Sequence, residues 1–253
     1  MLDRDAELQI AGGRPSTFAR VKVGVDQAGK VTAWQSETWG SGGPSGTNSP
    51  PVPYVFSFTN QRHVHTSVPT HTGPARAWRA PNHPQACLVT MAALEDAAAT
   101  LNKDPLDFFL DNISMTGTRA ENYAEELRLG ADLIDWKRKW KPRGQATGVV
   151  KRGLGLSLHT WGGRGHNSNC ELILHPDGSV EARLGSQDLG TGTRTVIAIV
   201  LADALGLDPD DITVRIGDSR FPQSGASGGS TTVGGVSSAT RRAALLATEA
   251  LFN

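Results

Sequence analysis

The residues of this sequence that could bind an anion gather in two glycine-rich segments and one arginine loop. The first segment, residues 185–195 (GSQDLGTGTRT), lies between a predicted strand and a predicted helix. Gly190 and Gly192 would let its backbone turn tightly and approach a ligand. The amides of residues 193–195 would then point from a helix N-terminus, which suits a phosphate or pyrophosphate. A plain glycine turn before a helix explains the same residues, because the third glycine of the dinucleotide fingerprint is absent.

The second segment is residues 224–235 (SGASGGSTTVGG), which also leads into a predicted helix. Backbone amides and the hydroxyls of Ser227, Ser230, Thr231 and Thr232 could wrap an anion here. The composition alone is typical of a flexible linker. However, the segment lies between a strand and an apolar helix that both need a core. Two such turns in one lobe therefore indicate a shared polar ligand.

The third segment is residues 77–84 (AWRAPNHP), where Arg79 follows Trp78 in a loop stiffened by prolines. The guanidinium of arginine offers a fixed fork of donors for an anionic group, and the prolines would hold its backbone in place. The alternative is a surface arginine whose aliphatic stem lies on Trp78.

The histidines and cysteines give no recognisable metal or nucleophile motif. His63 and His65 share one face of a predicted strand but lack a third ligand at a known spacing, which favours hydrogen-bonded strand histidines over a metal site. His83 and His166 lie in loops and are acid–base candidates only. The two cysteines, Cys87 and Cys170, are far apart and form no CxxC, which excludes a disulfide framework, a zinc ribbon or an iron–sulfur cluster held by this chain alone. Ser-His-Asp, HExxH, GxSxG and P-loop motifs are absent.

Composition narrows the class of protein further. The 253 residues contain 25 basic and 25 acidic side chains. The sequence therefore lacks the excess of basic residues that is typical of proteins that bind nucleic acid or anionic membranes. The longest apolar run, 196–207, contains Asp203 and is too short to span a bilayer. The first residues, MLDRDAEL, are not a signal peptide. We expect a soluble chain, cytoplasmic unless a partner's signal carries it to the periplasm.

The strands and helices predicted around these segments indicate an α+β architecture of two mixed α/β lobes. In the first lobe, residues 1–140, we expect strands at 17–25, 31–39 and 62–68 and helices at 84–101, 106–113 and 119–140, the second capped by Asp104 and the third broken near Gly130. Residues 141–148 (KPRGQATG) are the predicted linker. In the second lobe, residues 149–253, an alternating stretch (149–161) precedes a hairpin (170–184) around Pro176-Asp177-Gly178, a helix (193–205), a strand (212–216) and a last helix (237–252).

These motifs resemble, in their order, the molybdenum-binding subunit of the xanthine dehydrogenase/aldehyde oxidase family. The segments that carry the resemblance are WRAPNHPQ, DPLDFFLDN, PDGSV, SQDLGTGTRT, DALGLDPDDITVRIGDS and SGASGGSTT. Order, spacing and motif agree across most of residues 1–253. The resemblance implies an oxidoreductase that hydroxylates aldehydes, purines or N-heterocycles with water as the oxygen source.

The resemblance also implies how the metal is held. Molybdenum would be bound by the dithiolene of molybdopterin, often as the cytosine dinucleotide in bacteria, and the protein would surround the pterin and its phosphate with amides and hydroxyls. By motif, Trp78 and Arg79 would line the molybdenum pocket, with Arg79 orienting substrate or the metal's oxygen ligands. The residues against the pterin would be Leu189, Gly190 and Thr191 from one turn and Gly228, Gly229, Ser230 and Thr232 from the other.

Two residues and the length depart from the family pattern. Asn82 stands where family members usually have Gly, and Met91 where a Glu is common. The family's large subunit is far longer, so its base glutamate is expected beyond Asn253 and a glycine/glutamine-rich cofactor segment before Met1. We therefore expect an internal slice, a truncated product or one piece of a split subunit. Its expected partners are the rest of the large subunit, a 2Fe-2S subunit and an FAD subunit. The alternative is a non-catalytic remnant, or a module that binds a nucleotide or a protein.

Overall fold

A computed structural model describes residues 3–253, which fold into two compact units divided between Thr160 and Trp161. Each unit combines one three-stranded sheet with helices, so the predicted α+β architecture is confirmed. Among the described residues, no helix is long and apolar enough to cross a membrane.

The sheet of the first unit consists of β1 (Ser16–Val25), β2 (Val31–Ser41) and β3 (Asn60–Ser67), in that order. β1 and β2 are antiparallel, and β2 and β3 are parallel. Alternate residues of β2 are buried, Trp34 among them, as period-2 side-chain alternation requires of a strand with one face on a core. Two short helical segments, α1 (Arg4–Ala6) and η1 (Glu7–Ala11), precede the sheet.

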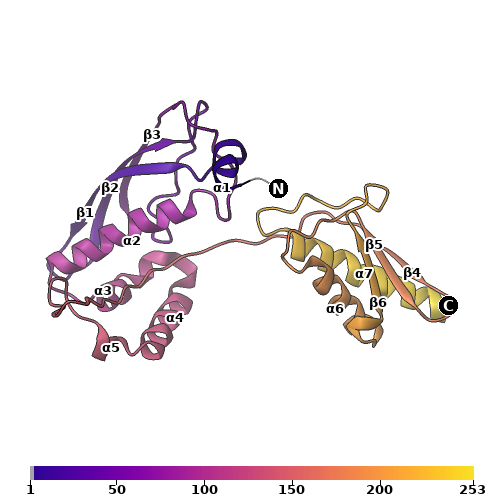
Figure 1. Cartoon of the computed structure of the whole chain (residues 1–253). Helices are drawn as coiled ribbons and strands as arrows, with labels where there is room; N and C mark the ends of the chain where they lie inside the picture. The colour runs from indigo at the N-terminus through magenta and orange to yellow at the C-terminus, as the bar shows by residue number, and fades with distance from the viewer. Residues whose placement is uncertain (1–2) are drawn as a thin grey trace. The chain divides into compact units, whose positions relative to one another are not determined.

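The helices of the first unit are α2 (His83–Thr100), α3 (Pro105–Asp111), η2 (Ile113–Arg119), α4 (Ala120–Leu133) and α5 (Trp136–Lys139). α2 packs on β1 and lies between the sheet and the helices α3 and α4 (Figure 1). The Asp104 side chain caps α3 as predicted, because Oδ1 accepts from the Leu106 amide at 2.8 Å. The predicted break at Gly130 is wrong: α4 continues through Gly130, and the chain turns at Asp135, whose φ is +59°.

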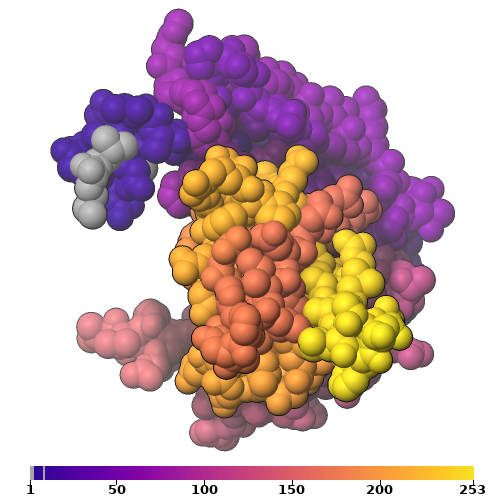
Figure 2. Space-filling model, turned by 90° about the vertical axis from the view of Figure 1, so that its right-hand side faces the viewer, coloured from indigo at the N-terminus to yellow at the C-terminus, as the bar shows by residue number. Residues whose placement is uncertain are grey.

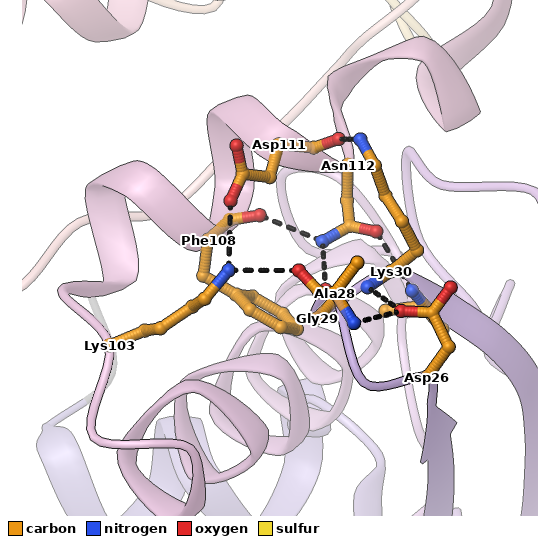
Figure 3. Close-up of polar contacts among 9 residues, drawn as sticks. Asp26, Ala28, Gly29, Lys30, Lys103, Phe108, Asp111 and Asn112 are labelled. Atoms are coloured by element: carbon orange, nitrogen blue, oxygen red, sulfur yellow. Dashed lines mark hydrogen bonds and ion pairs between the residues drawn. The ribbon is translucent and has the colours of Figure 1, made fainter.

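A buried amide joins the β1–β2 turn to α3 (Figure 3). Asn112 is 1% exposed; its Oδ1 accepts from the Val31 amide at 2.9 Å, and its Nδ2 donates to the carbonyls of Gly29 (3.1 Å) and Phe108 (2.9 Å). Lys103 Nζ donates to another carbonyl of the same turn at 3.0 Å. These contacts satisfy polar groups that the core would otherwise leave unpaired.

The sheet of the second unit consists of β4 (Glu171–Leu174), β5 (Val180–Leu184) and β6 (Ile212–Ile216), with β5 in the middle, antiparallel to β4 and parallel to β6. The connection from β5 to β6 contains α6 (Thr193–Leu205) and η3 (Pro209–Asp211), and α7 (Thr232–Phe252) ends the chain. α6 and α7 lie side by side against the sheet (Figure 1), and the last turns of α7 lie beside β4 (Figure 2). The core between these layers contains Val180, Ala182, Leu184, Ile197, Leu201, Val236 and Ala244.

Two boundaries differ from the sequence-based expectation. The units divide after Thr160, later than the 141–148 linker, because Leu158 is buried in the first core and Leu154 and Leu156 pack against it. The alternating stretch 149–161 forms no strand. α7 begins at Thr232 rather than at residue 237, so Gly234 and Gly235 are helical instead of part of a turn.

Candidate functional site

The two glycine-rich turns of the second unit lie together, joined by one glutamine. Gln187 Oε1 accepts from the Ser227 amide at 2.9 Å, and the Ser227 hydroxyl donates to the Gln187 carbonyl at 3.2 Å. The first turn follows β5 and the second precedes α7. The sequence placed both turns in one lobe, but the pairing of Gln187 with Ser227 has no sequence signal, because it joins residues 40 positions apart.

The first turn already holds an anion of its own, the Asp188 carboxylate. Oδ1 accepts from the amides of Gly190 and Thr191, each at 3.0 Å, and Oδ2 accepts from the Arg194 amide at 3.2 Å. These bonds, that from Arg194 first, hold the pKa of Asp188 below its ordinary value. The expectation of free amides at 193–195 is therefore wrong for Arg194, whose N–H is occupied by the chain's own carboxylate.

Four glycines of the two turns have open space where a side chain would stand. A Cβ built on Gly190, Gly192, Gly228 or Gly229 meets no atom within 4 Å. Gly190, Gly192 and Gly229 have positive φ values (+83°, +78° and +62°), a backbone conformation that favours glycine. The backbone of these turns is therefore bare at four positions, and a planar group could approach it closely.

The remaining candidates of this unit surround that bare backbone. Leu189 and Thr191 are exposed at the tip of the first turn, with Leu189 69% exposed. Ser230 has a φ of +59°, and its Oγ accepts from the Trp161 indole N–H at 2.7 Å. Thr232 is the first residue of α7 and half-buried. One apolar and several hydroxyl-bearing side chains thus flank the open glycines.

The other glycines of the second segment serve packing instead. A Cβ on Gly225 would lie 2.6 Å from His166 Cγ, and one on Gly235 would lie 2.3 Å from His166 Nδ1. A Cβ on Gly234 would lie 3.1 Å from the Arg164 carbonyl oxygen. The glycine-rich composition therefore reflects two requirements: open backbone at 228–229 and close chain crossing at 225, 234 and 235.

Trp78 and Arg79 lie in the first unit, in the loop that leads into α2. Both side chains are exposed. Arg14 holds the loop, because its guanidinium donates to the carbonyls of Arg79 (2.7 Å) and Ala80 (3.2 Å). Sequence reasoning missed Arg14, because no local pattern connects it to a loop 65 residues away.

The departure at Asn82 has a backbone explanation. Asn82 precedes α2 with a φ of +62°, in the left-handed region. Glycine adopts this conformation most readily and asparagine is among the next most tolerant residues, so asparagine fits this position at small cost. Met91, the second departure, is 4% exposed and part of the first core. A charged side chain there would have to be buried.

The strand histidines are hydrogen bonded at both ring nitrogens, as the sequence favoured. His63 contacts Ser36 Oγ (2.9 Å) and Ser49 Oγ (2.8 Å), and His65 contacts Thr38 Oγ1 (2.8 Å) and the Thr47 carbonyl (3.2 Å). Burial, followed by the nearby His65, lowers the pKa of His63. His83 Nδ1 lies 3.2 Å from the Tyr54 hydroxyl. Within residues 3–253, no group of three or more histidine, cysteine or carboxylate side chains is placed to hold a metal.

Comparisons with known proteins identify the family of this chain. Two family models, both described as molybdopterin cofactor-binding domain, match residues 1–113 and 129–253. The chain is 31% identical over 241 residues to the aldehyde oxidoreductase molybdenum-binding subunit PaoC of Escherichia coli O157:H7, covering 90% of this chain and 33% of that protein. This chain belongs to the molybdenum-binding subunits of the xanthine dehydrogenase and aldehyde oxidase family.

A more distant curated relative and two solved structures also match most of this chain. Xanthine dehydrogenase 1 of Arabidopsis thaliana is 26% identical over 249 residues, covering 85% of this chain and 18% of that protein. Among solved structures, quinoline 2-oxidoreductase from Pseudomonas putida 86 matches with a TM-score of 0.73 and 17% identity, covering 98% of this chain and 36% of the other. The aldehyde oxidoreductase from Desulfovibrio gigas matches with a TM-score of 0.70 and 20% identity, covering 91% of this chain and 28% of the other. The chain thus spans about a third of the length of its first curated relatives.

Proposed function

We propose that this chain forms cofactor-binding walls of a molybdenum hydroxylase that oxidises an aldehyde, a purine or an N-heterocycle. The observation that carries the proposal is the pair of joined turns with open space above Gly190, Gly192, Gly228 and Gly229. Molybdopterin needs a protein surface that offers amides and hydroxyls rather than metal ligands, and this donor set fits that need. The chemistry the group supplies when bound is two-electron oxidation of the substrate with water as the oxygen source.

Each turn has a distinct part in this proposal. Leu189, Gly190 and Thr191 form the face of the first turn toward the pterin, and Asp188 keeps that turn rigid by capping its amides. Gly228, Gly229, Ser230 and Thr232 form the face of the second turn. Because the Asp188 carboxylate is close to the first turn, we assign the cofactor's phosphate to the second turn, which has no such carboxylate among its own residues.

In the first unit, Arg79 is the proposed catalytic residue, orienting substrate beside the metal, with Trp78 as a wall of the pocket. The Arg14 guanidinium fixes the backbone of this loop, which leaves the exposed Arg79 side chain available for an anionic or carbonyl group. We assign the base glutamate to the rest of the large subunit, and the 2Fe-2S clusters and FAD to partner subunits. The bound pterin is either molybdopterin or its cytosine dinucleotide.

The test begins with the chain purified gently from its source together with its partners. The readouts are molybdenum per mole of chain and the fluorescence of the oxidised pterin. We expect both to be stoichiometric in the wild type and strongly reduced in Gly190→Ala. The matched control is Gly178→Ala, since Gly178 has a φ of +86° and open space above it but lies in the hairpin turn at the opposite end of β5. Equal cofactor content in the two variants would contradict the assignment of the first turn.

Arg79 is tested separately by turnover in the complete assembly. Arg79→Ala should reduce turnover while leaving molybdenum and pterin content unchanged, because the loop backbone is held by Arg14 and not by the Arg79 side chain. Arg62→Ala, an exposed arginine on β3, is the control. Unaltered turnover in Arg79→Ala would remove Arg79 from the active site.

A further inference from the structure

A short segment of the second unit is fastened along the second glycine-rich turn. We call this segment, residues 161–169, the strap. Its hydrogen bonds to the turn are Trp161 Nε1 to Ser230 Oγ (2.7 Å), His166 N to Thr231 O (3.1 Å), Gly225 N to Asn167 O (2.9 Å), Ser168 Oγ with Ser224 Oγ (2.6 Å) and Asn169 N to Gln223 O (3.0 Å). The contacts thus reach both ends of the turn.

The side chain of His166 occupies a slot between two glycines. A Cβ on Gly225 would lie 2.6 to 2.9 Å from Cγ, Cβ and Cδ2 of His166, and a Cβ on Gly235 would lie 2.3 Å from Nδ1 and 2.8 Å from Cε1. Both sets of distances are shorter than carbon contacts allow. The ring is therefore enclosed by backbone on two sides, one at the start of the turn and one in the first turn of α7.

The polar contacts of the ring connect it to the same turn. His166 Nδ1 lies 2.9 Å from Ser168 Oγ, which lies 2.6 Å from Ser224 Oγ. His166 Nε2 is buried and has no hydrogen-bond partner among the described residues. A purely apolar ring would fill the slot without enclosing an unpaired nitrogen. The Nδ1 contact, which orients Ser168 toward Ser224, is the interaction that distinguishes histidine from such a ring.

We propose that His166 is a positioning residue that fixes the conformation of the second glycine-rich turn. The ring separates Gly225 from Gly235, and its Nδ1 holds Ser168 against Ser224 at the beginning of the turn. With both ends set, Gly228, Gly229 and Ser230 keep the backbone that exposes them. The inference rests on the proposed function, because the consequence for molybdopterin follows only if this turn binds it.

The experiment compares four full-length variants by hydrogen exchange and by cofactor content. His166→Phe keeps the ring and loses Nδ1, and Ser168→Ala keeps the ring and removes its partner. His166→Asn returns a hydrogen-bonding group close to the position of Nδ1. His175→Phe, at the β4–β5 hairpin, is the matched control. Exchange of amides in β5 and α6 reports in each case whether the second unit is folded.

We expect exchange of the hydrogen-bonded amides of Gly225, Thr231 and Gly235 to be about five- to tenfold faster in His166→Phe and Ser168→Ala, the change that loss of one buried hydrogen bond produces. Molybdenum and pterin content should fall in the same two variants and be partly restored in His166→Asn, which returns the hydrogen bond but not the ring. Wild-type exchange of the Gly225, Thr231 and Gly235 amides in both His166→Phe and Ser168→Ala would overturn the proposal. A wild-type chain without molybdenum or pterin would instead refute the proposed function, while the exchange data would still decide the role of His166.

Discussion

Replacing Gly235 by alanine tests whether the second glycine-rich segment is shaped by packing or by turn formation. Gly235 is buried in the first turn of α7, facing the strap. If the glycine were there only for a flexible turn, alanine would favour the helix that the structure shows at this position. If close packing requires it, the added methyl group would collide with His166.

The sizes of two opposing effects decide whether Gly235→Ala stabilises or destabilises the second unit. Alanine is more favourable than glycine inside a helix by about 1 kcal/mol. Against this gain, the new Cβ would lie 2.3 Å from His166 Nδ1 and 2.5 Å from the His166 carbonyl oxygen. The second atom belongs to the backbone, so no rotation of a side chain relieves the contact, and overpacking of this kind costs about 1–3 kcal/mol. We expect a net loss of about 1–2 kcal/mol from the free energy of unfolding of the second unit, using the upper part of that range.

Gly130→Ala is the matched control, because Gly130 is also helical and a Cβ there meets no atom within 4 Å. It should stabilise α4 by up to about 1 kcal/mol. Hydrogen exchange resolved by segment measures both variants in the same chain, with faster exchange in α7 for Gly235→Ala and slower exchange in α4 for Gly130→Ala. Slower exchange of α7 in Gly235→Ala would refute the packing argument and return Gly235 to the turn.

Three further predictions concern other parts of the chain. Asn112→Ala should lower the free energy of unfolding of the first unit by about 2–4 kcal/mol, because it removes three buried hydrogen bonds. Asn122→Ala, at an exposed position, should change this free energy little, and urea unfolding measures both variants. The pKa of Asp188 is lowered in the fold, so its stabilisation of the second unit is complete above its unfolded pKa of about 3.9 and is lost as the pH falls through the lower folded pKa. In hydrogen exchange, Asp188→Asn should therefore make α6 less sensitive to acid below about pH 4, and an unchanged acid response would count against the cap. Burial raises the pKa of the Cys170 thiol to about 12, so its alkylation by iodoacetamide near pH 8 should be at least about a hundredfold slower than that of a free cysteine and become fast on unfolding. Mass spectrometry measures the rate of alkylation, and rapid labelling of the folded chain would contradict the burial of Cys170.

Local patterns were sufficient for most of the regular elements. The alternation of Val21, Val23 and Val25 identified β1, and the Pro-Asp-Gly turn identified the β4–β5 hairpin, because both signals depend on neighbouring residues only. Asp104 followed by Pro105 likewise marked the start of α3. The helix break predicted at Gly130 was wrong. An isolated glycine costs about 1 kcal/mol in a helix, and the packing of α4 stabilises the helix by more than that.

The arrangement of the candidate site depended on contacts between distant residues. Sequence identified both glycine-rich turns and the Trp78-Arg79 loop. It could not show that Gln187 joins the turns, that Arg14 holds the loop or that the strap holds the second turn, because each contact pairs residues far apart in the chain. Asp188 is different: its position two residues before Gly190 is a local signal that its carboxylate caps the amides of the turn.

The sequence by itself determined the elements, their order and, through the motifs in that order, the family. Only the tertiary structure decided what each glycine is for. Gly228 and Gly235 are the same residue type in one segment, yet one faces open space and the other touches His166. A glycine's role depends on what lies within about 4 Å of its missing Cβ. For Gly234 and Gly235 those neighbours come from the strap, about 70 residues earlier in the chain.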